Sequence, residues 1–224
     1  MVAERILSFL QLLHFESRLP KGFAVMNPYQ DEYTFGLCQQ FYTQYYSDHQ
    51  PRKLLLGINP GRFGSGVTGI SFTDPVKLET ICHIPNRFDK RAELSADFVY
   101  KVIEAFGGPT LFYQHFFISA LSPLGFLKDG KNINYYDDGR LQKIATPFII
   151  QSVSQMMEIG IRKHNVYCIG EGKNFAFFSA LNKKHQWFEE IISLPHPRFI
   201  MQYKRKSIHT YIDLYLKLLS EEVC

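Results

Sequence analysis

At 224 residues, with 46% hydrophobic and 21% charged side chains, the chain has an ordinary globular composition that excludes a disordered or collagen-like protein and favours a single domain over residues 1–224. Its net charge of +4 and its pI near 8.8 permit a nucleic-acid partner without requiring one. The four scattered cysteines form no CxxC or Cys/His cluster, so we expect no metal site and a reducing intracellular location, cytoplasmic and nucleoid-associated if the source is bacterial. No apolar run is long enough to span a bilayer, so we expect no membrane association.

The first part of the chain predicts two helices before a buried strand. Apolar residues at helical spacing indicate a helix over residues 4–16, and residues 21–28 are interpreted as a connection. A second helix is predicted over residues 31–46. The near-continuous apolar run over residues 53–58 predicts a strand that is buried on both faces, as in a parallel sheet.

The rest of the chain alternates strands with helices. Residues 71–90 are interpreted as a loop with one short helix, and residues 129–138 as a polar turn at the tip of a hairpin. Further strands are predicted over residues 116–121, 165–169 and 187–194. Further helices are predicted over residues 95–106, with Ser95 as the cap, 146–159, 175–181 and 207–219. This alternation predicts an α/β fold, a three-layer sandwich with a central, mainly parallel four-stranded sheet flanked by helices.

A Gly-rich loop follows the first predicted strand. It lies within residues 54–72, which read LLLGINPGRFGSGVTGISF. Glycine permits close approach of the backbone to a ligand and Pro60 fixes φ, so the loop has a defined shape. Asn59 stands where the strand ends, and ligands in open α/β sheets bind beyond the carboxyl ends of strands. Asn59 is therefore a candidate for chemistry.

Two more strand ends carry unusual residues. The second strand leads into residues 119–123, and the fourth leads into residues 195–198, which read PHPR. In a parallel sheet these ends open on one edge, which would bring His196 near Asn59. An isolated histidine between prolines is more often a structural loop residue. Beside a Gly-rich Asn loop, however, a neutral imidazole and an amide are typical of a polar binding site.

A basic stretch without acidic residues follows His196 and reads RFIMQYKRK. One interpretation is a solvated basic surface ahead of the last helix. The other is a loop whose cations grip phosphates while one of the apolar residues at positions 199, 200, 201 or 203 wedges between stacked bases. The interleaving of aromatic and basic side chains favours the second interpretation.

Longer motifs in the same places indicate a family. The motif GMNPG, followed by xFGxxxTGVxF, is matched by residues 57–61, 63–64, 68–70 and Phe72. A second motif, which begins HPSPR, is met in shortened form by residues 196–198. The chain therefore resembles the single-strand-selective monofunctional uracil-DNA glycosylases of the uracil-DNA glycosylase superfamily, as a bacterial-type branch with a diverged base-reading position. The resemblance implies a uracil-DNA glycosylase-like fold.

The resemblance implies a role for each central residue. Asn59 would position the water that attacks C1′ of the deoxyribose, and His196 would stabilise negative charge on the departing base. Phe72 would stack against the flipped base, and Gly61 would leave room beside it. Elementary chemistry agrees, because a base in a duplex must be extruded before it can be reached, and a fixed hydrogen-bond donor stabilises the charge that develops on it. We expect DNA as the partner, a monomer, and no cofactor or metal.

Two wider sets of contacts are also implied. Contacts to the base are expected from Ile58, Gly61, Phe72, Ser119, Ala120 and Ser122. Contacts to DNA are expected from Arg62, Lys173, Arg198, Phe199, Lys204, Arg205 and Lys206. Ala120 stands where the family has an Asn that reads the uracil edge, and a methyl group cannot make those hydrogen bonds. We therefore expect activity on uracil and on other deaminated bases, such as xanthine and hydroxymethyluracil.

The expected reaction is hydrolysis of the N-glycosidic bond in base excision repair, which leaves an abasic site. No lysine lies in the motifs, so lyase activity is not expected. The carboxylate base of classical uracil-DNA glycosylases is absent, and the carboxylates nearest the motifs, Glu32, Asp74 and Glu171, are expected to be caps or surface groups. Two alternatives are a catalytically inactive nucleic-acid-binding module of the same fold and a hydrolase of small nucleosides.

Overall fold

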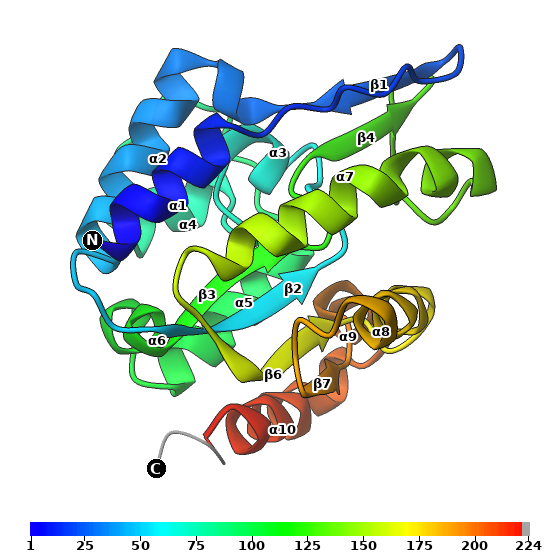
Figure 1. Ribbon diagram of the computed structural model, residues 1–224. Coiled ribbons are helices and arrows are strands. Elements are labelled where there is room, and N and C mark those ends of the chain that lie inside the picture. The colour runs from blue at the N-terminus through cyan, green and yellow to red at the C-terminus, as the bar shows by residue number, and fades with distance from the viewer. Residues whose placement is uncertain (221–224) are drawn as a thin grey trace.

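Four parallel strands form the central sheet of the computed structural model, which describes residues 1–220 (Figure 1). Their order across the sheet is β3 (Phe116–Ala120), β2 (Arg52–Gly57), β6 (Ile161–Ile169) and β7 (Glu190–Leu194). Every residue of β2 and β3 is buried. The apolar runs Leu54–Leu56 and Phe116–Ile118 follow from this position, because strands covered on both faces have no solvent-facing side.

Helices flank this sheet on both faces, which confirms the predicted α/β sandwich (Figure 1). In chain order they are α1 (Val2–Gln11), α2 (Glu32–Tyr45), α3 (Ser65–Thr68), α4 (Pro75–Thr80), α5 (Leu94–Ala105), α6 (Pro109–His115), α7 (Gly139–Met157), α8 (Lys173–His185), α9 (Pro197–Tyr203) and α10 (Ile208–Ser220). Short 3-10 turns cover Pro28–Gln30 and Arg205–Ser207. Within residues 1–220, no helix is long and apolar enough to cross a bilayer.

A small antiparallel sheet lies beside the Gly-rich loop. It consists of β1 (Phe23–Met26), β4 (Gly125–Lys128) and β5 (Lys131–Ile133). The interpretation of residues 21–28 as a connection was wrong, because the partner of β1 is contributed about a hundred residues later and the four strand residues show no alternation of burial. A hairpin is present, but its tip is only the Asp129-Gly130 pair, with φ of 48° and 74°, and residues 131–133 of the predicted turn form β5.

Three helices were not predicted: the four-residue α3 within the Gly-rich loop, α6 and α9. α6 and α9 each begin with a proline; Pro109 was interpreted as the end of the preceding helix, and Pro197 as part of a loop. Proline is favoured at the first position of a helix, because the N–H that it lacks has no partner there. The start of α5 was also misplaced: its N-cap is Glu93, and Ser95 lies inside the helix.

The helix predicted over residues 146–159 begins earlier than expected, at Gly139. Asp138 caps it by accepting hydrogen bonds from the N–H groups of Arg140 and Leu141. Pro147 lies inside the helix. Proline is disfavoured in the middle of a helix, so the residues around Pro147 give no local signal of a helix that continues on both sides of it.

Aromatic rings fill much of the core. Phe41 and Tyr113 meet edge to face at 5.2 Å, and Phe112 and Phe116 pack at 4.8 Å beside them. These rings are almost completely buried, so they serve packing. The described cysteines are buried free thiols, and Cys224 lies outside the described residues.

Candidate active site

The carboxyl ends of the four parallel strands meet at one edge of the sheet. The strand register pairs Gly57 with Ala120 and Ile169 with Leu194. A cavity of about 620 Å³ opens at this edge. Its wall includes residues at or just after the end of each strand, and Asn59 and His196 both line it. The structure thus brings together the two polar side chains that lie 137 positions apart in the sequence.

Phe72 forms one wall of the cavity and is held by the loop that precedes it. Its φ of 52° is rare for an aromatic residue and marks a locally strained backbone. Thr68 stabilises this turn, because its Oγ1 donates to the Thr73 carbonyl at 2.6 Å and accepts from the Ile70 N–H at 3.2 Å. The Phe72 ring lies against Gly57, where an added Cβ would come within 2.9 Å of Cε2. A flat apolar surface is therefore fixed beside the end of β2.

The Asn59 side chain is held by the segment that follows β5. Its Oδ1 accepts the N–H of Tyr135 at 3.1 Å, and its Nδ2 donates to the carbonyls of Ile133 and Pro60, each at 3.3 Å. The backbone donor at Tyr135 defines which amide atom is the oxygen. An amide oxygen has two lone pairs, so Oδ1 retains one for a group in the cavity.

His196 is neutral in the folded chain. Its Nδ1 accepts the N–H of Arg198 at 3.2 Å and caps the N-terminus of α9, so the neutral ring carries its proton on Nε2. Burial, with a contribution from the Arg198 cation, lowers the pKa of His196 to about 4. The ring lies near Gly170, where an added Cβ would stand 3.7 Å from Cδ2. His196 thus contributes a neutral N–H donor to the cavity.

The lowered pKa of His196 predicts a dependence of stability on pH. Between pH 6.5, the ordinary value, and about pH 4, the unfolded chain takes up a proton at His196 that the folded chain does not. Folding stability attributable to His196 therefore falls as the pH falls through this window, by on the order of 2 kcal/mol. Urea unfolding of the wild type and of His196→Asn, which retains a capping side chain, measures this difference at pH 7 and pH 4.5.

All other titrating groups are shared by the two proteins and cancel in that comparison. We expect the wild type to lose more stability than His196→Asn. Equal losses would show that His196 titrates near its ordinary value in the folded chain.

Four of the residues expected to contact the base, Ile58, Gly61, Ser119 and Ala120, line the cavity together with Phe72. Ser122 does not line it. Ser122 is fully buried, and its hydroxyl donates to the Leu124 carbonyl at 2.7 Å, because the chain turns away from the cavity after β3. The expectation that Ser122 contacts a base is therefore corrected.

Sequence reasoning missed Glu93, the N-cap of α5, which lines the cavity. An added Cβ on Gly61 would lie 2.9 Å from Glu93 Oε1, so the room expected beside Gly61 is bounded by this carboxyl group. The available signal was the acidic residue just before a predicted helix. Of the carboxylates considered from sequence, Asp74 caps α4 and Glu171 is exposed at the cavity rim, as expected for a cap and a surface group.

The stretch after His196 is helix α9, and the interpretation of it as a loop was wrong. Ile200 and Met201 face inward and are 0% and 7% exposed, because α9 packs against α5. Phe199 and Tyr203 are 45% and 71% exposed, and their ring centroids lie 5.5 Å apart. Both line the cavity, so of the four positions considered for a wedge the exposed ones are the two aromatic residues, Phe199 and Tyr203.

The predicted DNA-binding cations are all exposed. Arg198 and Lys173 line the cavity, and Lys173 Nζ stands 6.0 Å from the ring centroid of Tyr136. Arg62 donates to the Gly130 carbonyl at 2.9 Å, which ties it to the hairpin tip. The cations just beyond α9 lie outside the cavity wall and are Lys204, Arg205 and Lys206.

Comparisons with known proteins agree with this geometry. The family model of the uracil DNA glycosylase superfamily matches residues 43–220. Among solved structures, the chain is similar to wild-type SMUG2 from Pedobacter heparinus, with 44% sequence identity and a TM-score of 0.95 over 98% of this chain and 97% of that chain. No curated protein sequence matches the chain.

Proposed function

Because the chain belongs to the uracil DNA glycosylase superfamily, we propose that it hydrolyses the N-glycosidic bond of uracil and of other deaminated bases in DNA and leaves an abasic site. The observation that carries the proposal is the cavity itself. One neutral imidazole donor, one anchored amide and one aromatic face line the same space, contributed by His196, Asn59 and Phe72. DNA is the partner that this chemistry requires.

The first step is extrusion of the base. A base inside a duplex cannot reach groups in a cavity, so it must rotate out of the stack, at a cost of a few kcal/mol. The Phe72 ring supplies a flat surface on which the extruded base can stack. The cavity volume of about 620 Å³ is ample for a purine or a pyrimidine together with water.

The second step is cleavage of the bond. As the C1′–N bond breaks, its electron pair moves to the base and C1′ becomes electron-poor. The Nε2–H of His196 donates to the electron-rich base without adding a proton beforehand, since the ring is neutral. A water held by the free lone pair of Asn59 Oδ1 attacks C1′, and its proton leaves to solvent or to the released base.

We propose that this reaction is monofunctional. A lyase step needs an amine within reach of C1′. Lys173 is the lysine in the cavity wall, and its ammonium lies at the exposed rim over Tyr136. Water positioned by Asn59 is therefore the proposed nucleophile.

The proposed range of bases follows from β3. Ala120 lines the cavity where a family member would present an amide, and its methyl group makes no hydrogen bond. A site without that amide discriminates less sharply among bases. The proposed substrates are uracil, xanthine and hydroxymethyluracil.

Oligonucleotides that carry one uracil, hydroxymethyluracil, hypoxanthine or xanthine test the proposal in single- and double-stranded form. Cleavage after alkali, with intact strands before alkali, is the expected result. Strand breaks before alkali would contradict the monofunctional mechanism. Tight DNA binding without cleavage of any base would instead identify an inactive binding module.

The exposed aromatic pair on α9 yields a prediction about strandedness. We propose that Phe199 and Tyr203 enter the base stack while neighbouring cations contact phosphates. The double variant Phe199→Ala/Tyr203→Ala should lower kcat/KM on double-stranded uracil substrate by about tenfold more than on single strands, because only the duplex must be unstacked. Single-turnover rates on the two substrates measure this ratio.

Leu12→Ala is the matched control, since Leu12 is as exposed as Tyr203, at 71%, and is not part of the cavity wall. It should leave both rates unchanged. An equal loss on both substrates in the double variant would argue against a wedge.

A further inference from the structure

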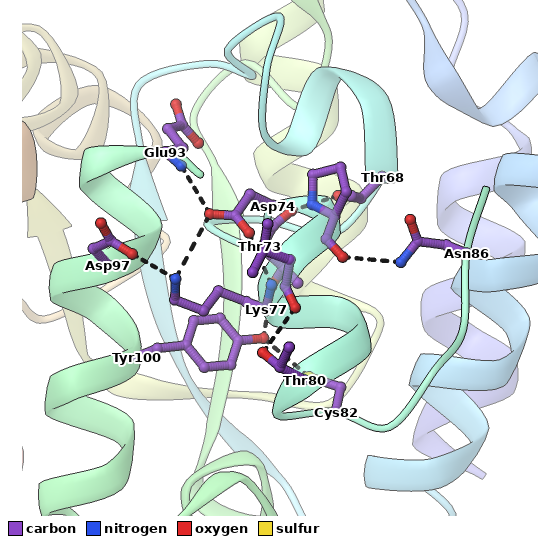
Figure 2. Close-up of polar contacts among 12 residues, drawn as sticks. Thr68, Thr73, Asp74, Lys77, Thr80, Cys82, Asn86, Glu93, Asp97 and Tyr100 are labelled. Atoms are coloured by element: carbon purple, nitrogen blue, oxygen red, sulfur yellow. Dashed lines mark hydrogen bonds and ion pairs between the residues drawn. The ribbon is translucent and has the colours of Figure 1, made fainter. Parts of the chain in front are cut away.

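Glu93 is held at the cavity through its backbone. Its N–H donates to Asp74 Oδ2 at 2.8 Å (Figure 2). Asp74 is fully buried and also caps α4 by accepting the Lys77 N–H at 2.8 Å. Lys77 in turn pairs with Asp97 of α5. This network fixes the backbone of Glu93 beside the Gly-rich loop and leaves its side chain out of the network.

The Glu93 carboxyl group points away from Asp74 and Lys77 (Figure 2). It takes up the space above two glycines of the loop: an added Cβ on Gly61 would lie 2.9 Å from Oε1, and one on Gly64 would overlap Oε2. Both oxygens therefore lie against the loop that carries Asn59.

Within residues 1–220 the backbone N–H and C=O of Glu93 are hydrogen-bonded, to Asp74 and Asp97, but no donor reaches its carboxyl oxygens. The other carboxylates of the cavity wall, Asp137 and Glu171, are exposed, whereas Glu93 is partly buried. Polar groups removed from water are normally bonded, so an unbonded carboxyl group facing a cavity is suited to a ligand that supplies the partner.

The surrounding charges agree with such a role. Burial raises the pKa of Glu93, the charge of Asp74 raises it further, and the Arg198 cation opposes them. Arg198 makes no ion pair with Glu93 among the described residues, so the carboxyl group is not neutralised by a direct partner. A carboxyl group in this setting can accept a hydrogen bond when ionised, and can also donate one when protonated.

We propose that Glu93 is a specificity-determining residue that contacts the edge of the extruded base on the side of Gly61. This inference rests on the proposed function. Deamination turns an amino group and a ring nitrogen into a carbonyl acceptor and an N–H donor, and a carboxyl group can bond either of them. Glu93 thereby contributes base contacts that the methyl group of Ala120 cannot make, on a different wall of the cavity.

The variants Glu93→Ala and Glu93→Gln test this assignment. Single-turnover kcat/KM is measured on the four deaminated bases, and affinity is measured for DNA that carries a stable abasic-site analogue. Glu93→Ala should lower kcat/KM on the best base by about 10² and change the ratio between bases by about tenfold or more, because a site built to bond a polar edge loses that bond. Affinity for the abasic analogue should not change, since no base is present there.

Glu93→Gln retains two polar atoms at the same place and should recover at least tenfold of the loss on one or more bases. Glu104→Ala is the control, because Glu104 is an exposed carboxylate on the same helix. It should behave as the wild type in every assay.

Three results would overturn the inference: a uniform loss on all bases, a parallel loss of affinity for the abasic analogue, or unchanged rates in Glu93→Ala. The first two would indicate that Glu93 only maintains the loop. Failure of the proposed function is distinguishable, because in that case the wild type itself would cleave none of the four bases.

Discussion

Replacement of His196 by alanine should slow base release by about 10² to 10³, or roughly 2.7 to 4 kcal/mol of activation free energy. The reason is geometric. The Arg198 N–H occupies Nδ1, so Nε2–H is the donor that the ring offers to the cavity, and alanine offers none. Single-turnover cleavage of uracil-containing oligonucleotides measures the loss, and affinity for the same DNA should change much less.

The matched control is His209→Ala, which removes an exposed histidine from α10. It should cleave as the wild type does. Because the pKa of His196 is about 4, its contribution to the rate should stay constant from pH 9 down to about pH 5. A titration near pH 6.5 that disappears in His196→Ala would show that the cationic ring is the active form and would contradict this mechanism.

Replacement of Asn59 by alanine should reduce the rate of cleavage by about 10², because a reacting group displaced by about 1 Å already costs that much. Three hydrogen bonds hold the amide in one orientation at the cavity wall, and only one of the two Oδ1 lone pairs is used by them. Without the amide, the water has no fixed acceptor. Cleavage and DNA binding are measured separately, and only cleavage should fall strongly.

Loss of Asn59 also removes a tether between the loop and the segment after β5, so a control for that tether is needed. Asn132 provides one, since its Oδ1 accepts the Arg62 N–H at 3.0 Å and joins the same loop to β5. Asn132→Ala should therefore keep most of its activity. Equal losses of activity in the two variants, or parallel losses of binding and cleavage, would indicate that Asn59 acts by holding the loop.

The parallel sheet was predictable because its strands are continuous apolar runs. Burial on both faces favours apolar residues over most of β2 and β3, so local composition reveals these strands although Arg52, Lys53 and Ser119 are also buried in them. In contrast, β1 is short, partly exposed and paired with the distant β4, so the information that makes it a strand lies outside its own residues. The prolines at the starts of α6 and α9 misled the prediction because proline both ends and begins helices.

The residues of the site likewise fall into those that sequence motifs reveal and those that they do not. Asn59 and Phe72 lie in one long motif, and His196 lies in a second, so both parts were visible in the sequence. Glu93 lies in neither motif. Its place at the cavity depends on a hydrogen bond from its backbone to Asp74 and on the absence of side chains at two loop glycines. Ser122 was wrongly included because its position two residues after β3 does not reveal that its hydroxyl is directed to the Leu124 carbonyl.

The sequence by itself determined the fold class, the edge of the sheet where the cavity lies, and the identity of an amide, an imidazole and an aromatic ring at that edge. These features depend on composition and order along the chain, which the residues display directly. Only the tertiary structure decided the tautomer of His196, the orientation of the Asn59 amide, the helical form of residues 197–203 and the presence of Glu93. Each of these depends on a contact between segments that are distant in sequence or on the direction of a backbone group, and neither is encoded in local pattern.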